Sequence, residues 1–415
     1  MYILCTKPVS AEGLFDMKET PLKTKLKPYA LLAAGCIAMA SCSKPGASIE
    51  LTNELDLKRT EVISLNLHLL DSSLYKTAHL QIKDAQGNIL PSQELDEDGD
   101  GEPDELIFQA TLKPKETQTV SIERTEKTND TTTTLRTYAR FVPERIDDYA
   151  WENDRVAFRT YGPEAQRLVD ENQPGGTLSS GIDCWLKRVD YPIIDKWYKK
   201  GETGGTYHQD GGEGLDNYHV GASRGNGGIG VWKNDSLYVS KNFTTYKRLA
   251  NGPLRTVFEL TYAPWKVDDI TVNETKRITI DLGTQMSKVE VSLSTSAPLP
   301  NVTIGITLHD KKGETKTDSI HGWTSYWEPL DDSYLGTGVI INPEDVIRFQ
   351  EFRKEKKDLS HLYVVAKPID GKVTYYNGFG WKRAGRFFTF EKWTAYLTEM
   401  SQRLASPVKI KYIKK

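Results

Sequence analysis

One stretch of the chain, YHQDGGEGLDNYHVG at residues 207–221, gathers side chains that can transfer protons. It contains two His, two Asp, one Glu and two Tyr among four Gly. A His beside a carboxylate in a partly buried pocket is the usual pair for acid–base catalysis near neutral pH. Five residues of this stretch are therefore candidates for one cleft: His208, Asp210, Glu213, Asp216 and His219.

Two other interpretations of residues 207–221 remain open. A zinc site fits poorly, because the helical His-Glu-x-x-His spacing is missing and the glycines argue against a helix. The stretch can also be a Gly-rich turn whose His and Asp side chains satisfy backbone groups. We favour a functional site, because five ionisable groups within twelve residues are costly to bury without a ligand.

Cations and aromatic side chains elsewhere are candidates for substrate binding. Arg155 and Arg159 lie in the charged segment 140–163, and Lys247 and Arg255 flank the tight turn at residues 251–253. Such cations can bind a substrate carboxylate, although they can equally form structural ion pairs. Aromatic rings can stack on sugars or fill the core. The ring-bearing candidates are Trp151, His321, Trp323 and Trp381.

An acidic loop, DEDGDGEPDE at residues 96–105, resembles part of a calcium-binding loop. Alternate carboxylates around a Gly turn suit Ca²⁺, a hard cation that takes six to eight oxygen ligands. The predicted ligands are Asp96, Asp98, Asp100 and Asp104, but the twelfth position, which should be Glu, is Ile107. The alternative is a solvated, metal-free hairpin turn. If Ca²⁺ binds, we expect a structural role.

The elements that must position these residues are mostly strands. Short alternating runs separated by turn residues predict a small β-sandwich over residues 47–130, with the polar stretch 127–135 as its boundary. Residues 131–415 contain too many strands for a second small sandwich and predict one large antiparallel sandwich. Helices are predicted at 390–404, where apolar residues recur every three or four positions, and at the charged segment 343–357.

The N-terminal segment reads as a targeting signal. Lys23, Lys25 and Lys27 precede a short apolar run at residues 29–41, which is too short to span a bilayer. Small residues just before Cys42 resemble a bacterial lipobox, whose Cys is acylated and becomes the mature N-terminus. Cys36 fits less well, and the start is expected at Met17. Residues 1–46 are thus predicted to be a signal peptide, lipobox and tether.

The composition limits the classes of binding partner that we expect for the protein. Lys and Arg total 54 and Asp and Glu total 57, a net charge of −3, so no basic field for nucleic acid is expected. Membrane contact is expected only through the lipid on Cys42, placing the protein in the cell envelope, on the periplasmic or surface side of the outer membrane. Cys184 is expected to be a buried thiol. We predict no cofactor apart from the possible Ca²⁺.

Four segments together resemble a family of secreted bacterial proteins of unknown function, whose members commonly lie in polysaccharide-utilisation gene clusters. In chain order they are DDYAWENDRVAFRTYGP, YHQDGGEGLDNYHVG, NGPLR and YYNGFGWKRAGRFFTFEKW. The large domain of that family looks like the galactose-mutarotase-like supersandwich. The resemblance therefore implies an all-β chain, with a small N-terminal β-sandwich, this supersandwich and a C-terminal helix.

The resemblance also implies catalytic roles for individual residues. Mutarotase-like chemistry needs a His acid and a carboxylate base beside a sugar ring, for which the candidates are His208 and Glu213, then His219 and Asp216. A lyase needs a cation on a uronate carboxylate and a base at C5. The candidates for these two roles are Arg155, Lys247 or Arg255 for the first and His208 or Tyr207 for the second.

The leading hypothesis is a lyase or hydrolase acting on uronate-containing oligosaccharides. Aldose epimerase activity, and a lipoprotein that binds glycans without catalysis, are the alternatives. A pure binder needs aromatic platforms but no cluster of titratable groups, so the composition of residues 207–221 favours an enzyme.

Overall fold

The computed structural model describes residues 46–75, 79–97, 99–126, 135–177 and 179–413, all within one compact unit that spans residues 44–415. Cys42, Asp98 and most of the predicted boundary at 127–135 lie outside these residues. In the described part of the chain, no helix is long and apolar enough to cross a membrane.

The first described elements form a small β-sandwich with its own core. One layer has the strand order β27-β1-β7-β3-β4 and the other β2-β6-β5. Inward-facing apolar residues such as Ile49, Leu65, Phe108 and Ile122 fill the space between the layers. The elements are β1 (Gly46–Thr52), β2 (Arg59–Asn66), η1 (Leu67–Leu69), α1 (Ser72–Tyr75), β3 (His79–Lys83), β4 (Ile89–Leu90), β5 (Ser92–Leu95), β6 (Glu105–Leu112) and β7 (Thr117–Thr125).

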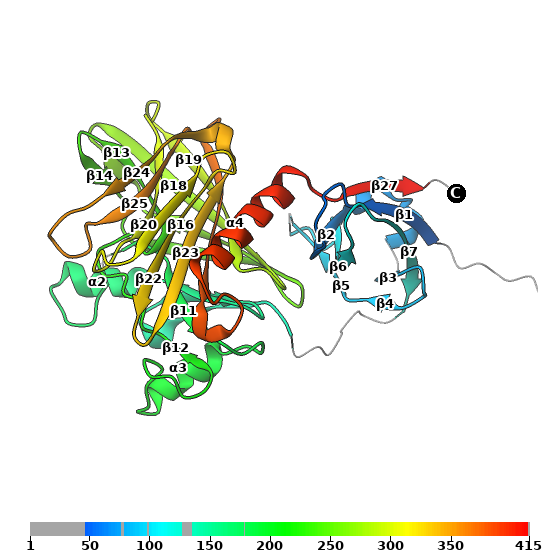
Figure 1. The fold of residues 1–415 in the computed structure, drawn as a ribbon, viewed down its shortest axis with the longest axis horizontal. Helices are drawn as coiled ribbons and strands as arrows, with labels where there is room; N and C mark the ends of the chain where they lie inside the picture. The colour runs from blue at the N-terminus through cyan, green and yellow to red at the C-terminus, as the bar shows by residue number, and fades with distance from the viewer. Residues whose placement is uncertain (1–45, 76–78, 98, 127–134, 178, 414–415) are drawn as a thin grey trace, which may run out of the picture. The chain divides into compact units, whose positions relative to one another are not determined.

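The C-terminal strand belongs to this small sandwich. β27 (Lys409–Ile413) pairs antiparallel with β1, and the red strand lies beside the blue one in Figure 1. The chain therefore returns to its first sandwich after completing the large one. The predicted domain of residues 131–415 did not anticipate this return.

The remaining strands form a large antiparallel assembly of three sheets. The widest has the order β15-β16-β18-β19-β26-β23-β22-β21, with β17 paired to β18. The other two have the orders β14-β13-β20-β25-β24 and β12-β11-β10-β9-β8 (Figure 1). One core cluster takes apolar side chains from all three sheets, including Phe158, Ile304 and Phe379. The predicted all-β fold, with a small and a large sandwich, is confirmed.

These sheets are built from the following elements of the chain. They are β8 (Tyr138–Val142), η2 (Pro143–Arg145), β9 (Asp148–Glu152), β10 (Ala157–Thr160), β11 (Asp183–Lys187), β12 (Gly214–Leu215), β13 (Asn226–Lys233), β14 (Ser236–Tyr238), β15 (Phe243–Asn251), β16 (Arg255–Tyr262), β17 (Trp265–Val267), β18 (Ile270–Asp281), β19 (Met286–Thr295), β20 (Val302–Thr307), β21 (Glu314–Asp318), β22 (Trp323–Leu330), β23 (Ser333–Ile341), η3 (Pro343–Asp345), β24 (Val346–Phe352), β25 (His361–Ala366), β26 (Lys372–Trp381) and η4 (Lys382–Ala384).

The C-terminal helix forms where its apolar spacing predicts it. α4 (Phe390–Ala405) begins after Thr389, whose hydroxyl accepts the backbone N–H of Lys392. Trp393 and Leu397 on its buried face belong to a core cluster shared with Trp323. The helix packs against β22 and β23 of the nine-stranded sheet (Figure 1).

The predicted helix at 343–357 is wrong. Pro343 begins only a short 3₁₀ turn, and β24 follows and pairs with β25 as an edge strand. The charged residues that suggested a helix are the exposed positions of this strand and of the loop after it. Three helices of the described residues were not predicted: α1, α2 (Pro163–Asp170) and α3 (Ile194–Glu202). They are at most three turns long, which leaves little periodicity to detect.

Candidate functional site

A pocket of about 460 Å³ lies against the second half of the 207–221 stretch. Its walls combine titratable side chains with backbone of that stretch and of the chain after α2. The lining residues are Arg159, Tyr161, Gly176, Thr177, His208, Asp216, Asn217, Tyr218, His219, Val220, Gly221 and Ala222. We call this the His208 pocket. It brings together three of the predicted catalytic residues: His208, Asp216 and His219.

His208 is held in one orientation by the loop itself. Its Nδ1 lies 2.7 Å from the carbonyl oxygen of Asp216 and 3.6 Å from Oδ2 of the same residue. A carbonyl only accepts hydrogen bonds, so Nδ1 carries a proton and Nε2 is the basic nitrogen of the neutral ring. The side chain is 59% exposed, which leaves Nε2 able to exchange a proton with a ligand.

Beneath His208 lies a buried cluster of one guanidinium and three carboxylates. Nη2 of Arg159 donates to Oδ2 of Asp183 at 2.5 Å and to Oδ2 of Asp216 at 3.0 Å. Nη1 of the same residue lies 3.6 Å from Oδ2 of Asp148. Neighbouring strands position these groups, because Arg159 on β10 stands directly opposite Asp183 on β11. The hydroxyl of Tyr161 also donates to Asp183 at 3.2 Å.

One cation cannot balance three buried carboxylates, and the pKa values reflect this. Burial, reinforced by the charge of Asp216 and opposed by Arg159, raises the pKa of Asp183 to about 7. Burial also raises the pKa of Asp148 to about 6 against the opposing charge of Arg159. Near neutral pH the cluster therefore holds a proton on its buried carboxyl groups.

Two atoms at the pocket are buried without a hydrogen-bond partner in the part of the chain that the structure describes. They are the hydroxyl of Tyr218 and Nη1 of Arg159. Both residues line the pocket. A buried polar group without a partner costs free energy until a ligand or water supplies one. The hydroxyl of Tyr218 is therefore available to a hydroxyl group of a ligand, whereas Nη1 of Arg159 faces Asp148.

The loop that forms the pocket is anchored at its far end. Nε2 of His309 donates to the carbonyl of His219 at 2.7 Å, and its Nδ1 lies 2.8 Å from both oxygens of Glu328. Burial lowers the pKa of His309, but pairing with Glu328 outweighs this and raises it overall. His219 also bonds Asp358 at 3.0 Å. Any Cβ at Gly221, where φ is +54°, would meet this pair.

Glu213 does not share the pocket with His208. It lines a separate hollow of about 520 Å³ together with Tyr191, Lys196 and Tyr207. Its Oε1 accepts from Tyr191 at 2.5 Å and from Lys196 at 2.6 Å. Burial raises the pKa of Glu213, but these bonds outweigh it and lower the pKa overall. The expectation that His208 and Glu213 act in one cleft is therefore wrong, and Glu213 is an ion-paired carboxylate.

The other acidic residue of the stretch also has a structural role. Asp210 accepts the backbone N–H groups of Gly212 and Gly214 at 2.8 and 3.1 Å, and it pairs with Arg188 and Arg383. It closes the turn that the Gly-rich alternative describes. Within the stretch, Asp210 and Glu213 are therefore structural, whereas His208 and residues 216–221 line the pocket.

The predicted aromatic platforms are in the core. Trp151, Trp323 and Trp381 are 0%, 2% and 3% exposed, and Nε1 of Trp151 donates to Ser287 at 2.9 Å. A ring this buried cannot stack on a sugar. His321 lies outside the His208 pocket, in a turn where it bonds Asp318 at 2.8 Å. Their predicted contact with substrate is corrected accordingly.

The Arg and Lys side chains predicted to bind substrate lie in different parts of the structure. Arg159 lines the His208 pocket but is occupied by carboxylates, as described above. Arg155 pairs with Asp154 at 2.9 Å, and Arg255 forms a two-pronged pair with Asp281 at 2.6 and 2.8 Å. Lys247 is exposed on β15. None of these last three cations lines the His208 pocket.

The acidic loop folds as a hairpin turn. Asp96 accepts the N–H groups of Gly99 and Gly101 at 2.6 and 2.9 Å, Asp100 accepts that of Glu102 at 2.8 Å, and Asp104 accepts that of Glu97 at 2.7 Å. These carboxylates point at their own backbone. Among the described residues, no group of three or more His, Cys, Asp or Glu could hold a metal ion. Asp98 lies outside the described residues, and Ca²⁺ binding by this loop stays a prediction.

Sequence reasoning missed Asp148, Asp183 and Tyr218. A signal for Asp183 existed, because the segment GIDCWLKRV at residues 181–189 places charged residues inside an otherwise apolar strand. Charged residues are almost never fully buried unless they are paired. Here Asp183 is paired with Arg159, and Cys184 is the buried thiol that was expected.

Comparison with known proteins places the chain in a family. A family model described as Domain of unknown function (DUF4861) matches residues 51–410. This chain belongs to the DUF4861 family. The resemblance to a family of unknown function is thereby confirmed. A similar protein, "Uncharacterized protein P7" of Formosa agariphila, is 42% identical over 387 residues, which cover 91% of this chain and 97% of that one.

The fold of this DUF4861 protein is similar to that of larger solved structures. A protein in the glycosyl hydrolase family 38 from Enterococcus faecalis matches with a TM-score of 0.50 at 10% sequence identity, over 89% of this chain and 47% of that one. An alpha-mannosidase from Enterococcus faecalis matches with a TM-score of 0.46 at 8% identity, over 89% of this chain and 46% of that one. The DUF4861 chain spans about half the length of these structures. At 10% identity, the likeness to the glycosyl hydrolase family 38 protein concerns the fold alone.

Proposed function

We propose that this DUF4861 protein is an enzyme that cleaves uronate-containing oligosaccharides, by lyase or hydrolase chemistry, in the His208 pocket. The observation that carries the proposal is the oriented imidazole of His208 above the buried cluster of Arg159 and Asp216. The fold likeness to a protein in the glycosyl hydrolase family 38 supports carbohydrate as the class of substrate.

The pocket offers one group that can accept a proton and one that can donate a proton. In elimination, Nε2 of His208 takes the proton from the carbon beside the uronate carboxylate, and the departing glycosidic oxygen receives a proton from the hydroxyl of Tyr218 as the double bond forms. In hydrolysis, His208 takes a proton from the attacking water, and the hydroxyl of Tyr218 gives one to the departing glycosidic oxygen.

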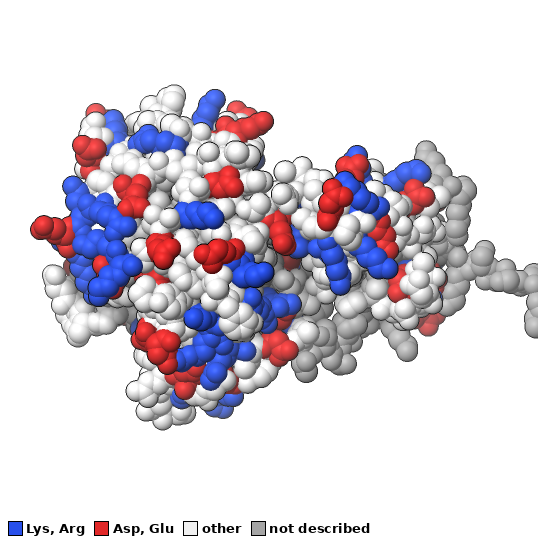
Figure 2. Space-filling view, in the orientation of Figure 1, with Lys and Arg blue, Asp and Glu red and all other residues white. Residues whose placement is uncertain are grey.

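The charge beside the pocket supports an anionic substrate. Asp358, which bonds His219, ends a loop whose exposed cations include Arg353, Lys354, Lys356 and Lys357. Figure 2 shows Lys and Arg gathered over this loop between β24 and β25. Such a group of like charges attracts anionic ligands at low ionic strength.

The experiment is incubation of the purified protein with pectic, ulvan-like and arabinogalactan fragments. Absorbance of unsaturated products reports elimination, and chromatographic shifts report any cleavage. We expect turnover that His208→Gln reduces about a hundredfold or more, while His68→Gln retains wild-type turnover. His68 is the matched control, because it is a histidine with a 65% exposed side chain in the small sandwich. No product from any of these glycans would count decisively against the proposal.

The same samples separate the other activities. Faster anomeric exchange in NMR spectra without bond cleavage would instead assign epimerase activity. Binding that survives His208→Gln, with no turnover in the wild-type protein, would assign a glycan-binding role.

We also propose that Cys42 is acylated and tethers the protein to the outer membrane. The motivation is the apolar run at residues 29–41 and the small residues before Cys42. Metabolic labelling with a palmitate analogue should mark the wild-type protein and not the Cys42→Ser variant. Labelling of both proteins, or of neither, would contradict the assignment.

A further inference from the structure

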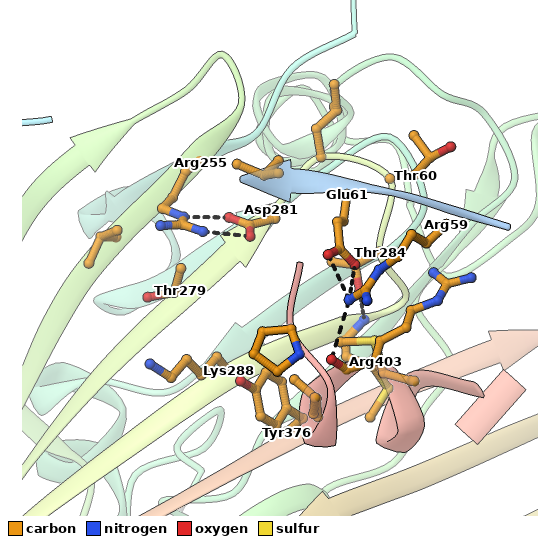
Figure 3. Close-up of a pocket in the computed structure, with 18 of the residues that line it drawn as sticks. Arg59, Thr60, Glu61, Arg255, Thr279, Asp281, Thr284, Lys288, Tyr376 and Arg403 are labelled. Atoms are coloured by element: carbon orange, nitrogen blue, oxygen red, sulfur yellow. Dashed lines mark hydrogen bonds and ion pairs between the residues drawn. The ribbon is translucent and has the colours of Figure 1, made fainter. Parts of the chain in front are cut away.

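A second and larger pocket, of about 640 Å³, lies away from the His208 pocket. It is bordered by strand β2, by the nine-stranded sheet and by the end of α4, and Figure 3 shows part of its lining. The described residues that line it include none that lines the His208 pocket. Its volume is within the range of small-molecule sites. We call it the Arg59 pocket.

The charges that line the Arg59 pocket balance one another. Five lining residues are Arg or Lys and five are Asp or Glu. Most of them already form ion pairs: Arg59 with Glu61 at 2.7 Å, Arg255 with Asp281 at 2.6 Å, Arg277 with Glu97 at 2.9 Å and Lys288 with Glu290 at 2.8 Å. Figure 3 shows two of these pairs as dashed lines at the pocket wall. The pocket therefore presents both hydrogen-bond donors and acceptors, and the formal charges of its lining residues sum to zero.

The same pocket also has apolar surface and unused hydrogen-bonding capacity. Met286, Tyr376, Met400 and Leu404 line it beside the ion pairs. Arg59 is only 1% exposed, and its Nε has no hydrogen-bond partner among the described residues. A buried N–H donor without a partner indicates that a bound group can complete the site.

We propose that the Arg59 pocket binds a neutral oligosaccharide, at a site distinct from the His208 pocket. A sugar hydroxyl can donate to a carboxylate and accept from a guanidinium, so it can bond both members of an ion pair without displacing either. A carboxylated or cationic ligand would bring an uncompensated charge into a pocket whose own charges are already paired, which costs free energy. The ring of Tyr376 offers the apolar surface that a sugar C–H face prefers.

This site does not depend on the proposed reaction, because binding in the Arg59 pocket requires no turnover. The experiment is ligand-observed saturation-transfer NMR with maltotriose, cellotriose, xylotriose and galactotriose, and with the galacturonic acid trimer as the charged comparison. We expect at least one neutral trisaccharide to bind. Tyr376→Ala should weaken that binding about tenfold or more, and His208→Gln should leave it within about twofold.

Two further variants keep the result interpretable. Tyr246→Ala removes a 46% exposed tyrosine from the same nine-stranded sheet, outside the pocket, and should bind like the wild type. Lys288→Gln, at a side chain 36% exposed, should weaken binding without the folding risk of losing a ring. Three results would each overturn the proposal: no binding of any neutral trisaccharide at millimolar concentration, binding lost with His208→Gln but kept with Tyr376→Ala, or the charged trimer displacing the neutral one from the wild type.

Discussion

Replacing Asp183 by Asn tests whether the carboxylates beneath the His208 pocket hold a proton near neutral pH. Burial, together with the charge of Asp216 and against that of Arg159, raises the pKa of Asp183 from 3.8 to about 7. Each pKa unit corresponds to about 1.36 kcal/mol, so ionising Asp183 costs the folded protein about 4 kcal/mol. Because the folded pKa is the higher one, the free energy of unfolding should fall as pH rises from about 4 to about 7.

The assay is equilibrium urea unfolding followed by tryptophan fluorescence from about pH 5 to about pH 8. Between pH 5 and 7 this one group should remove about 2 kcal/mol from the free energy of unfolding of the wild-type protein. The Asp183→Asn protein should lack that part of the decline, since Asn can still accept from Arg159 but does not titrate. Asp269→Asn, at an exposed carboxylate, should follow the wild-type profile. Parallel profiles for wild type and Asp183→Asn would refute the reasoning.

Three further substitutions test other parts of the structure. Arg159→Met leaves the buried carboxylates without their cation and should lower the free energy of unfolding by about 3–5 kcal/mol; a loss below about 1 kcal/mol in urea unfolding would contradict this. Trp393→Ala opens a cavity at a fully buried ring and should cost about 3–5 kcal/mol, visible as a lower melting temperature that Trp393→Phe partly restores. Thr389→Ala removes the cap of α4 and should cost about 1 kcal/mol, with Thr389→Ser close to wild type in the same urea assay.

The secondary structure could be predicted from the sequence wherever buried residues recur with the period of a single strand or helix. The apolar stripe of α4 keeps its helical spacing, so this helix was predicted at nearly its observed position, and the many strands of residues 131–415 predicted a large antiparallel sandwich. The segment 343–357 was misread because charge alone does not distinguish an exposed edge strand from an exposed helix. The return of β27 to β1 is a long-range pairing that no local pattern reveals.

The candidate site was predicted less completely. His208 and Asp216 were found because their stretch is dense in titratable groups, but density does not say which way each side chain faces. Arg155 and Arg159 were predicted together as substrate-binding cations of one charged segment, yet β10 begins only at Ala157, so Arg155 lies before the strand that carries Arg159. Asp183 contributes to the same cluster from β11, and only the pairing of β10 with β11 brings it there.

The contrast between two buried ion clusters supports a functional role for one of them. Glu152 and Lys187 form a fully buried pair of one anion and one cation, in which Glu152 also accepts backbone N–H groups at the start of α3 and Lys187 donates to two carbonyls. The two charges of that pair balance, and its contacts account for it as a structural ion pair. The Arg159 cluster has three carboxylates for one cation, leaves Oδ1 of Asp148 and of Asp183 without hydrogen-bond partners among the described residues, and borders a pocket. Such an imbalance weakens the fold. A carboxyl group whose proton can leave near neutral pH, in a cluster that also contains pocket-lining residues, is typical of sites for acid–base chemistry.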